Sequence, residues 1–150
     1  MKRSVVRLAL AAAGAAVLVP GVPALAEERV WRGTSPAEAN CILNGTSVEG
    51  TVKVETDAVL EAYGIRVIGN VHAENARKVV LLDRSQIGGS VQIVQGHAAR
   101  VIRARITGDI LFDEQEGALA AKGNRIGGNL QAFQNSGGST VRNNRIDGNL

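Results

Sequence analysis

A seven-residue motif recurs after 20 residues near the C-terminal end of the sequence, and this repetition limits what the chain can fold into. Residues 124–130 read Asn-Arg-Ile-Gly-Gly-Asn-Leu, and residues 144–150 read Asn-Arg-Ile-Asp-Gly-Asn-Leu. Looser copies precede them at intervals of 19 or 20 residues. Such spacing predicts one structural unit that is repeated along the chain. One glycine marks each copy: Gly50, Gly69, Gly89, Gly108, Gly128 and Gly148.

Apolar residues alternate with polar ones around each marker glycine. A β-branched residue stands two positions before it in every copy, and Val, Ile or Leu stands two positions after it. This period of two is typical of strands with one buried face. A unit of about 20 residues cannot bury such a face alone, so the units must stack. We predict an all-β fold, a single-stranded parallel β-helix (β-solenoid) of about five coils over residues 44–150.

A second pair of inward positions is expected nine and seven residues before each marker glycine. Changes in repeat length are expected in the loop that follows the strand after the glycine, in residues 55–59, 74–79, 94–98, 113–118 and 133–138. The predicted inward pairs are Leu60 and Ala62, Val80 and Leu82, Ala99 and Val101, Leu119 and Ala121, and Ser139 and Val141.

The marker glycines have two structural explanations. Either the corner of the coil requires a positive φ, or stacked backbones approach too closely for a Cβ atom. The next position in each copy carries a short polar residue, which we expect to hydrogen-bond turn backbone and its counterparts along the stack. These residues are Thr51, Asn70, Ser90, Asp109, Asn129 and Asn149.

Residues 1–26 have the pattern of a cleaved export signal. Three basic residues precede an apolar run at residues 8–19, and Ala24-Leu25-Ala26 forms a cleavage site. We therefore expect a periplasmic or extracellular protein after cleavage near Ala26, with no membrane span in the mature chain.

Residues 27–43 are expected to cap the first coil. Ser35 to Glu38 fit a capping box that begins a short helical turn, and Trp31 is expected to plug the core.

The signal sequence accounts for the positive net charge of the whole chain. The sequence has 17 Lys and Arg against 14 Asp and Glu, and Lys2, Arg3 and Arg7 lie in the predicted signal. The mature chain is balanced, so net charge gives no reason to expect nucleic-acid binding.

Cys41 is the one cysteine in the sequence. Three explanations remain open for it: a missing partner, an intermolecular bond or a buried thiol. Because Leu150 falls within a strand, we expect either a longer natural chain or an open edge suited to end-to-end self-association.

Arginine recurs three residues before the marker glycine. Arg66, Arg105, Arg125 and Arg145 should form a column on one outer face, with the last three on consecutive coils. Two explanations are open: acidic neighbours and solvent balance the charges, or the column binds an anionic ligand such as a uronic-acid polysaccharide. Arg100, Arg103 and Arg142 would widen such a patch.

No catalytic or metal-binding motif is recognisable in the sequence. His72 and His97 are out of phase and are expected at the surface. The carboxylates of Asp109, Asp113, Glu114 and Glu116 could gather as calcium ligands, but a solvated loop is the simpler interpretation. We expect no cofactor, no metal and no catalytic residue.

The repeated Asn-Arg-Ile-x-Gly-Asn-Leu motif, behind a signal sequence, resembles exported bacterial proteins with G-N-L-type β-helix repeats. The wider architecture is similar to the right-handed parallel β-helix of pectate-lyase-type proteins. That resemblance implies a right-handed coil. None of the catalytic residues of those lyases maps onto this chain. Polymer-forming solenoids of the bactofilin type are also similar, but they are typically cytosolic.

Together these patterns predict a non-catalytic structural or surface-interaction module. The favoured ligand is an anionic polysaccharide or cell-surface glycan along the arginine column. The alternatives are a small polysaccharide lyase or hydrolase, which would need carboxylates facing the arginines, and a self-assembling scaffold.

Overall fold

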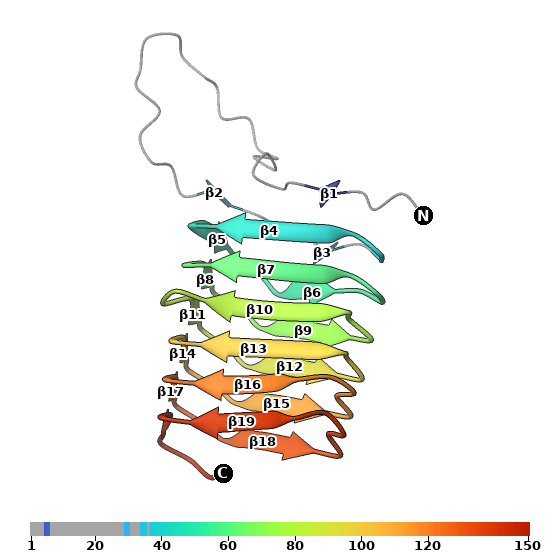
Figure 1. The fold of residues 1–150 in the computed structure, drawn as a ribbon. Coiled ribbons are helices and arrows are strands. Elements are labelled where there is room, and N and C mark those ends of the chain that lie inside the picture. The colour runs from blue at the N-terminus through green and yellow to red at the C-terminus, as the bar shows by residue number, and fades with distance from the viewer. Residues whose placement is uncertain (1–4, 7–28, 31–33, 36) are drawn as a thin grey trace, which may run out of the picture.

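Three parallel sheets run side by side along the molecule, and each coil contributes one strand to each sheet (Figure 1). The computed structural model describes residues 5–6, 29–30, 34–35 and 37–150. All its regular elements in this part of the chain are strands, so the protein is an all-β solenoid of about five coils.

The strands of each sheet follow the chain in the same order. Sheet A contains β1 (Val5–Val6), β4 (Asn40–Asn44), β7 (Val59–Tyr63), β10 (Lys78–Leu82), β13 (Ala98–Ile102), β16 (Leu119–Lys122) and β19 (Ser139–Arg142). Sheet B contains β2 (Arg29–Val30), β5 (Thr46–Val48), β8 (Arg66–Val67), β11 (Gln86–Ile87), β14 (Arg105–Ile106), β17 (Arg125–Ile126) and β20 (Arg145–Ile146). Sheet C contains β3 (Thr34–Ser35), β6 (Val52–Val54), β9 (Val71–Glu74), β12 (Val91–Val94), β15 (Ile110–Asp113) and β18 (Leu130–Phe133).

The apolar columns of the repeat form the core. In the column two residues before the glycine, Val48, Val67, Ile87, Ile106 and Ile126 are all buried. The columns after the glycine are buried from Val52 to Leu130, and they include Phe112, the largest fully buried side chain, whereas Ala132 and Leu150 at their end are exposed. The predicted alternation is therefore confirmed in the central coils. The last coil is more open, since Ser139 is exposed and Val141 and Ile146 are only partly buried.

The predicted inward pair in β10 is wrong by one residue. Strand β10 aligns Val79 with Leu60 and Leu81 with Ala62. Val79 and Leu81 are fully buried in the core cluster. Of the predicted pair, Val80 is buried at 4% exposure but lies outside that cluster, and Leu82 is only partly buried. Residues 79–82 are all apolar, so they show no alternation of apolar and polar residues. The sequence therefore does not indicate which two of them face the core.

The repeat from Gly69 to Gly89 is one residue longer than the repeat before it. The extra residue lies in the corner after β10 and not in the predicted loop at residues 74–79. Asp83 and Arg84 both have positive φ, of 56° and 65°, at a corner where neighbouring coils place the single residues Gly64 and Arg103. In the last two full repeats the extra residue does lie in the expected segments, 113–118 and 133–138, after β15 and β18. A corner outside the sheets can absorb an added residue without disturbing the ladder.

Close stacking of the backbone explains five of the six marker glycines. None of the six has a positive φ. A Cβ atom on Gly69 would lie 2.7 Å from the carbonyl oxygen of Gly50, and one on Gly148 would lie 2.6 Å from that of Gly128. For these five, close approach is therefore the correct one of the two explanations left open by the sequence, whereas a Cβ atom on Gly50, in the first copy, would meet nothing within 4 Å.

The short polar residues after the marker glycines form the expected ladder along the stack. Asn70 Oδ1 accepts a hydrogen bond from the Ser90 amide at 2.8 Å, and Ser90 Oγ accepts one from the Asp109 amide at 3.0 Å. Asp109 Oδ1 and Asn129 Oδ1 continue the series to the amides of Asn129 and Asn149. These residues therefore stabilise the corner between sheets B and C.

A second polar ladder lies inside the corner between sheets A and B. Asn124 is 2% exposed, accepts a hydrogen bond from the Ala104 amide at 2.9 Å and donates to the Val101 carbonyl at 2.7 Å. Asn144 repeats the arrangement one coil later. These side chains satisfy backbone groups that the turn removes from the sheet ladder. This role of Asn124 and Asn144 was not predicted from the sequence.

The chain before β4 adds strands to the ladders and does not form the expected helical turn. Ser35 lies in β3 and aligns with Val54 of β6, and Glu38 has a φ of 59°, which excludes it from a right-handed helix. Strand β4 begins at Asn40, within the segment expected to be a cap, and Cys41 is buried in register with Leu60. Trp31, Pro36 and most of residues 1–26 lie outside the described residues.

Candidate anion-binding groove

The predicted arginine column exists in sheet B. Arg105 aligns with Arg125, and Arg125 aligns with Arg145, so these three side chains lie on consecutive coils. Gln86 separates Arg105 from Arg66, which lies two coils away. All four arginines are exposed. Alternation places their guanidinium groups outside because the neighbouring residue in each strand enters the core.

A groove of about 300 Å³ runs along the corner between sheets A and B and brings four arginines together. We call it the arginine groove. Gly123 lies in this corner one coil after Arg103 and has no side chain, which leaves space between Arg103 and Arg125. The groove is lined by Arg84, Gln86, Arg103, Arg105, Gly123 and Arg125, with Ala104 at its base.

Two of the four predicted site residues line the arginine groove. Arg105 and Arg125 do so, whereas Arg66 lies beyond Gln86 and Arg145 lies near Asp147, at 3.8 Å from a carboxylate oxygen. Of the residues expected to widen the patch, Arg103 lines the groove and Arg142 aligns with Lys122 near the same corner. Arg100 belongs to sheet A, where it aligns with Ala120, so it lies on a different face.

Arg84 is the groove residue that the sequence analysis missed. It follows the extra residue in the corner after β10, and its backbone amide donates to the carbonyl of Arg103 at 3.0 Å. This contact stacks the two arginines at the corner of successive coils. The available signal was the pair Asp83-Arg84 between the apolar run of β10 and the next inward residue.

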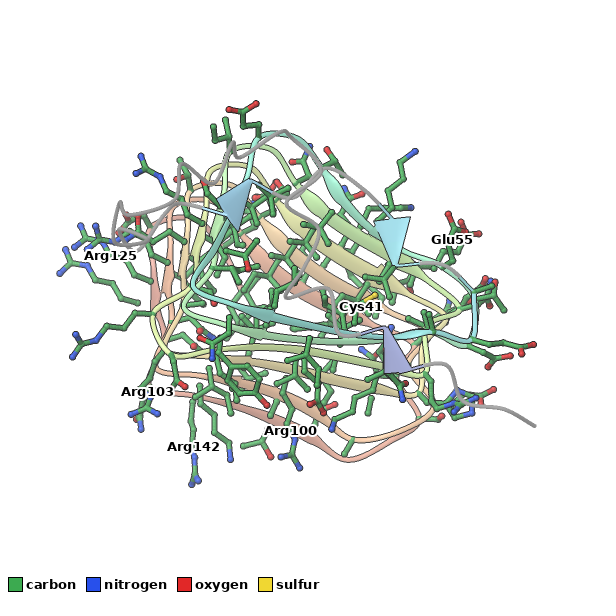
Figure 2. The ribbon with its side chains drawn as sticks, turned by 90° about the horizontal axis from the view of Figure 1, so that it is seen from above. Cys41, Glu55, Arg100, Arg103, Arg125 and Arg142 are labelled. Carbon is green, nitrogen blue, oxygen red and sulfur yellow. The ribbon has the colours of Figure 1, made fainter. Side chains whose placement is uncertain are left out.

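The groove has an excess of positive charge. Among the described residues that line it there are four arginines and no carboxylate. One acidic residue lies beside it, since Asp83 Oδ1 is 3.2 Å from an Arg103 guanidinium nitrogen. Figure 2 shows the Arg103 and Arg125 side chains directed away from the ribbon into solvent. Repulsion between such exposed charges is weak in water, at about 1 kcal/mol for close pairs, so the fold tolerates the cluster without a ligand.

Carboxylates gather at a different corner, between sheets C and A. Here a groove of about 510 Å³, which we call the carboxylate groove, is lined by Asp57, Asn75, Gln95, His97, Glu114 and Glu116, among others. Gln95 Nε2 donates to Glu114 Oε2 at 2.7 Å, and His97 Nε2 lies 3.4 Å from Glu116 Oε2. Figure 2 shows Glu55 on the side of the molecule opposite Arg125.

The structure separates the acidic residues that the sequence analysis grouped. Asp109 belongs to the polar ladder between sheets B and C, while Glu114 and Glu116 line the carboxylate groove. His72 is on the outer face of sheet C in register with Lys53 and Gln92, away from His97. Within the described part of the chain no three potential ligands are placed to share a metal ion. No helix of that part is long and apolar enough to cross a bilayer.

Comparison with family models, curated proteins and solved structures gave no match for this chain.

Proposed function

We propose that this protein is an exported β-solenoid that binds an anionic polysaccharide along the arginine groove. The observation that carries the proposal is the convergence of Arg84, Arg103, Arg105 and Arg125 on one groove that no described carboxylate lines. Guanidinium groups donate in a fixed fork that matches carboxylate and sulfate geometry. A repeat that places one or two arginines on each coil suits a linear polymer with regularly spaced negative charges.

Export is the part of the proposal that rests on residues 1–26 alone. The basic residues, the apolar run and the Ala24-Leu25-Ala26 site support it. An intact-mass measurement of the protein recovered outside the cytoplasm tests it: cleavage predicts a chain that begins at Glu27, and an uncleaved chain would contradict it.

The lyase alternative required carboxylates that face the arginine column in the same groove. The carboxylates of Glu114 and Glu116 line a different corner instead. Asp83, which lies beside the arginine groove, is paired with Arg103. We therefore propose binding and no bond cleavage.

Binding should be measured with the purified full chain and polygalacturonate, with dextran as the neutral control. We expect binding to polygalacturonate only, with an affinity that falls as salt screens the charges. Replacement of Arg105 and Arg125 by alanine should weaken binding by at least about tenfold, because two charge-assisted contacts are removed.

The matched control is the pair Lys53→Ala and Arg100→Ala. It removes the same charge from exposed positions on sheets C and A, away from the groove. An equal loss of affinity in both double variants would show that net charge and not the groove binds the polymer. Absence of binding by a folded wild-type protein at low salt would overturn the proposal.

A further inference from the structure

Two grooves of opposite charge lie at the two ends of the strands of sheet A. The arginine groove follows the corner where sheet A leads into sheet B. The carboxylate groove follows the corner where sheet C leads into sheet A. Its lining carries the carboxylates of Asp57, Glu114 and Glu116, and the imidazole of His97 is the one basic group in that lining. The proposed polysaccharide function explains the first groove and leaves the second without a role.

Three further carboxylates lie beside the carboxylate groove. Glu74 and Asp113 both align with Val94 at the ends of their strands in sheet C, and Glu55 follows β6. Two basic residues lie at this corner outside the lining: Arg77 is half-buried, and Lys78 begins β10 and is paired with Glu61 at 2.6 Å. The corner between sheets C and A is therefore strongly acidic, whereas the corner between sheets A and B is strongly basic.

The two charge clusters also lie at the same level of the stack. The coil formed by β13, β14 and β15 carries Arg103 and Arg105 at one corner. The same coil carries Glu114 and Glu116 at the other. A second molecule displaced sideways, with no shift along the solenoid axis, would therefore set its carboxylates opposite these arginines. Coils that repeat at about 4.8 Å in both molecules would keep the neighbouring columns in register.

From this arrangement we infer that the protein associates laterally with copies of itself. The arginine groove of one molecule docks against the carboxylate groove of the next. The two surfaces differ, so the contact is heterologous, and simple translation extends it into an open row rather than a closed dimer. Complementary charge across the contact sets the register and makes assembly sensitive to salt. This association goes beyond the proposed polysaccharide binding and competes with it for the same arginines.

Charge reversal at each groove tests the inference by sedimentation velocity over a series of protein and salt concentrations. Wild type should form species larger than a monomer at low salt and dissociate as salt rises. The variant with Arg105→Glu and Arg125→Glu has two arginines and two glutamates in the lining of the arginine groove, so that groove loses its excess of positive charge while the carboxylate groove stays intact. The variant with Glu114→Lys and Glu116→Lys has Asp57 and two lysines in the lining of the carboxylate groove, so that groove loses its excess of negative charge while the arginine groove stays intact. All four positions are exposed, so both variants should keep the fold, which circular dichroism checks. Each variant alone should associate at least about tenfold more weakly than wild type.

The equimolar mixture of the two reversed variants is the decisive sample. One variant keeps the carboxylate groove and the other keeps the arginine groove, so the mixture should form one-to-one complexes that neither variant forms alone. The variant that carries all four substitutions has neither groove intact and should stay monomeric. Reversal of Lys53 and Arg100 to glutamate, on other faces, should leave assembly unchanged.

A monomeric wild type at low salt would overturn the inference, and so would a mixture that stays monomeric while wild type assembles. One of these variants also distinguishes self-association from polysaccharide binding. The variant with Glu114→Lys and Glu116→Lys keeps the arginine groove, so it should bind polygalacturonate at least as well as wild type although it no longer assembles.

Discussion

Glycine at the marker position illustrates how stacking restricts single residues. At Gly69 the nearest atoms to an added Cβ are the carbonyl oxygen and carbon of Gly50 and the amide nitrogen of Thr51, all of them backbone atoms. Backbone in a continuous ladder cannot move aside as a flexible side chain can. The chain therefore needs glycine here for space and not for conformation.

Replacement of Gly69 by alanine should destabilise the protein by about 1–3 kcal/mol, because the methyl group forces two coils apart. Urea denaturation followed by circular dichroism measures the change. The control is Gly138→Ala, where an added Cβ meets nothing within 4 Å and φ is not positive. The control should stay within about 1 kcal/mol of wild type or gain stability from a less flexible unfolded chain. Equal losses in both variants would contradict the stacking argument.

Strand β10 shows what sets register at the scale of an element. The run Lys78 to Leu82 offers two possible inward pairs, and both would place apolar side chains in the core. Pairing with β7 and β13 selects Val79 and Leu81. The corner then absorbs the extra residue at Asp83 and Arg84, and this placement brings Arg84 into the arginine groove.

This register predicts different costs for two adjacent leucines. Leu81→Ala should cost about 2–5 kcal/mol, since Leu81 is fully buried and its truncation leaves a cavity. Leu82→Ala should cost less than half as much, because Leu82 is only partly buried at the edge of the strand. Chemical denaturation of the two variants distinguishes the registers. The reverse order of stability would favour the register first expected from the sequence.

The whole molecule is a stack in which each coil contacts only its neighbours, and burial varies along it. Strands β9, β12 and β15 each bury both inward residues, whereas in β18 only Leu130 is buried and in β19 no residue is. Stability in such stacks is a sum of nearest-neighbour terms. Local opening should therefore be easiest in the last coil.

Amide hydrogen exchange tests this gradient. Amides of Val91–Val94 and Ile110–Asp113 should exchange slowest, and those of Ser139–Arg142 should exchange at least about tenfold faster because their opening exposes little apolar surface. Exchange followed by mass spectrometry of peptic fragments resolves the three segments. Uniform protection from β9 to β19 would show that the stack opens only as one unit.

Several features followed from the sequence by itself. The 19–20 residue period and the alternation around each glycine predicted the solenoid, its inner columns and the arginine column, because a repeated unit must place equivalent residues one above another. The short polar residues after the glycines predicted their hydrogen-bonded ladder for the same reason.

Tertiary structure decided what a single repeat could not. The inward pair of β10, the corner position of Arg84 and the reason for glycine at the marker position all depend on contacts between coils. The same holds for the two charged grooves: residues such as Arg103 and Glu114 lie 11 positions apart in the sequence, yet they belong to different corners of one coil. Local pattern fixes which side of a strand faces the core, whereas the path of the chain around each coil determines which exposed charges share a surface.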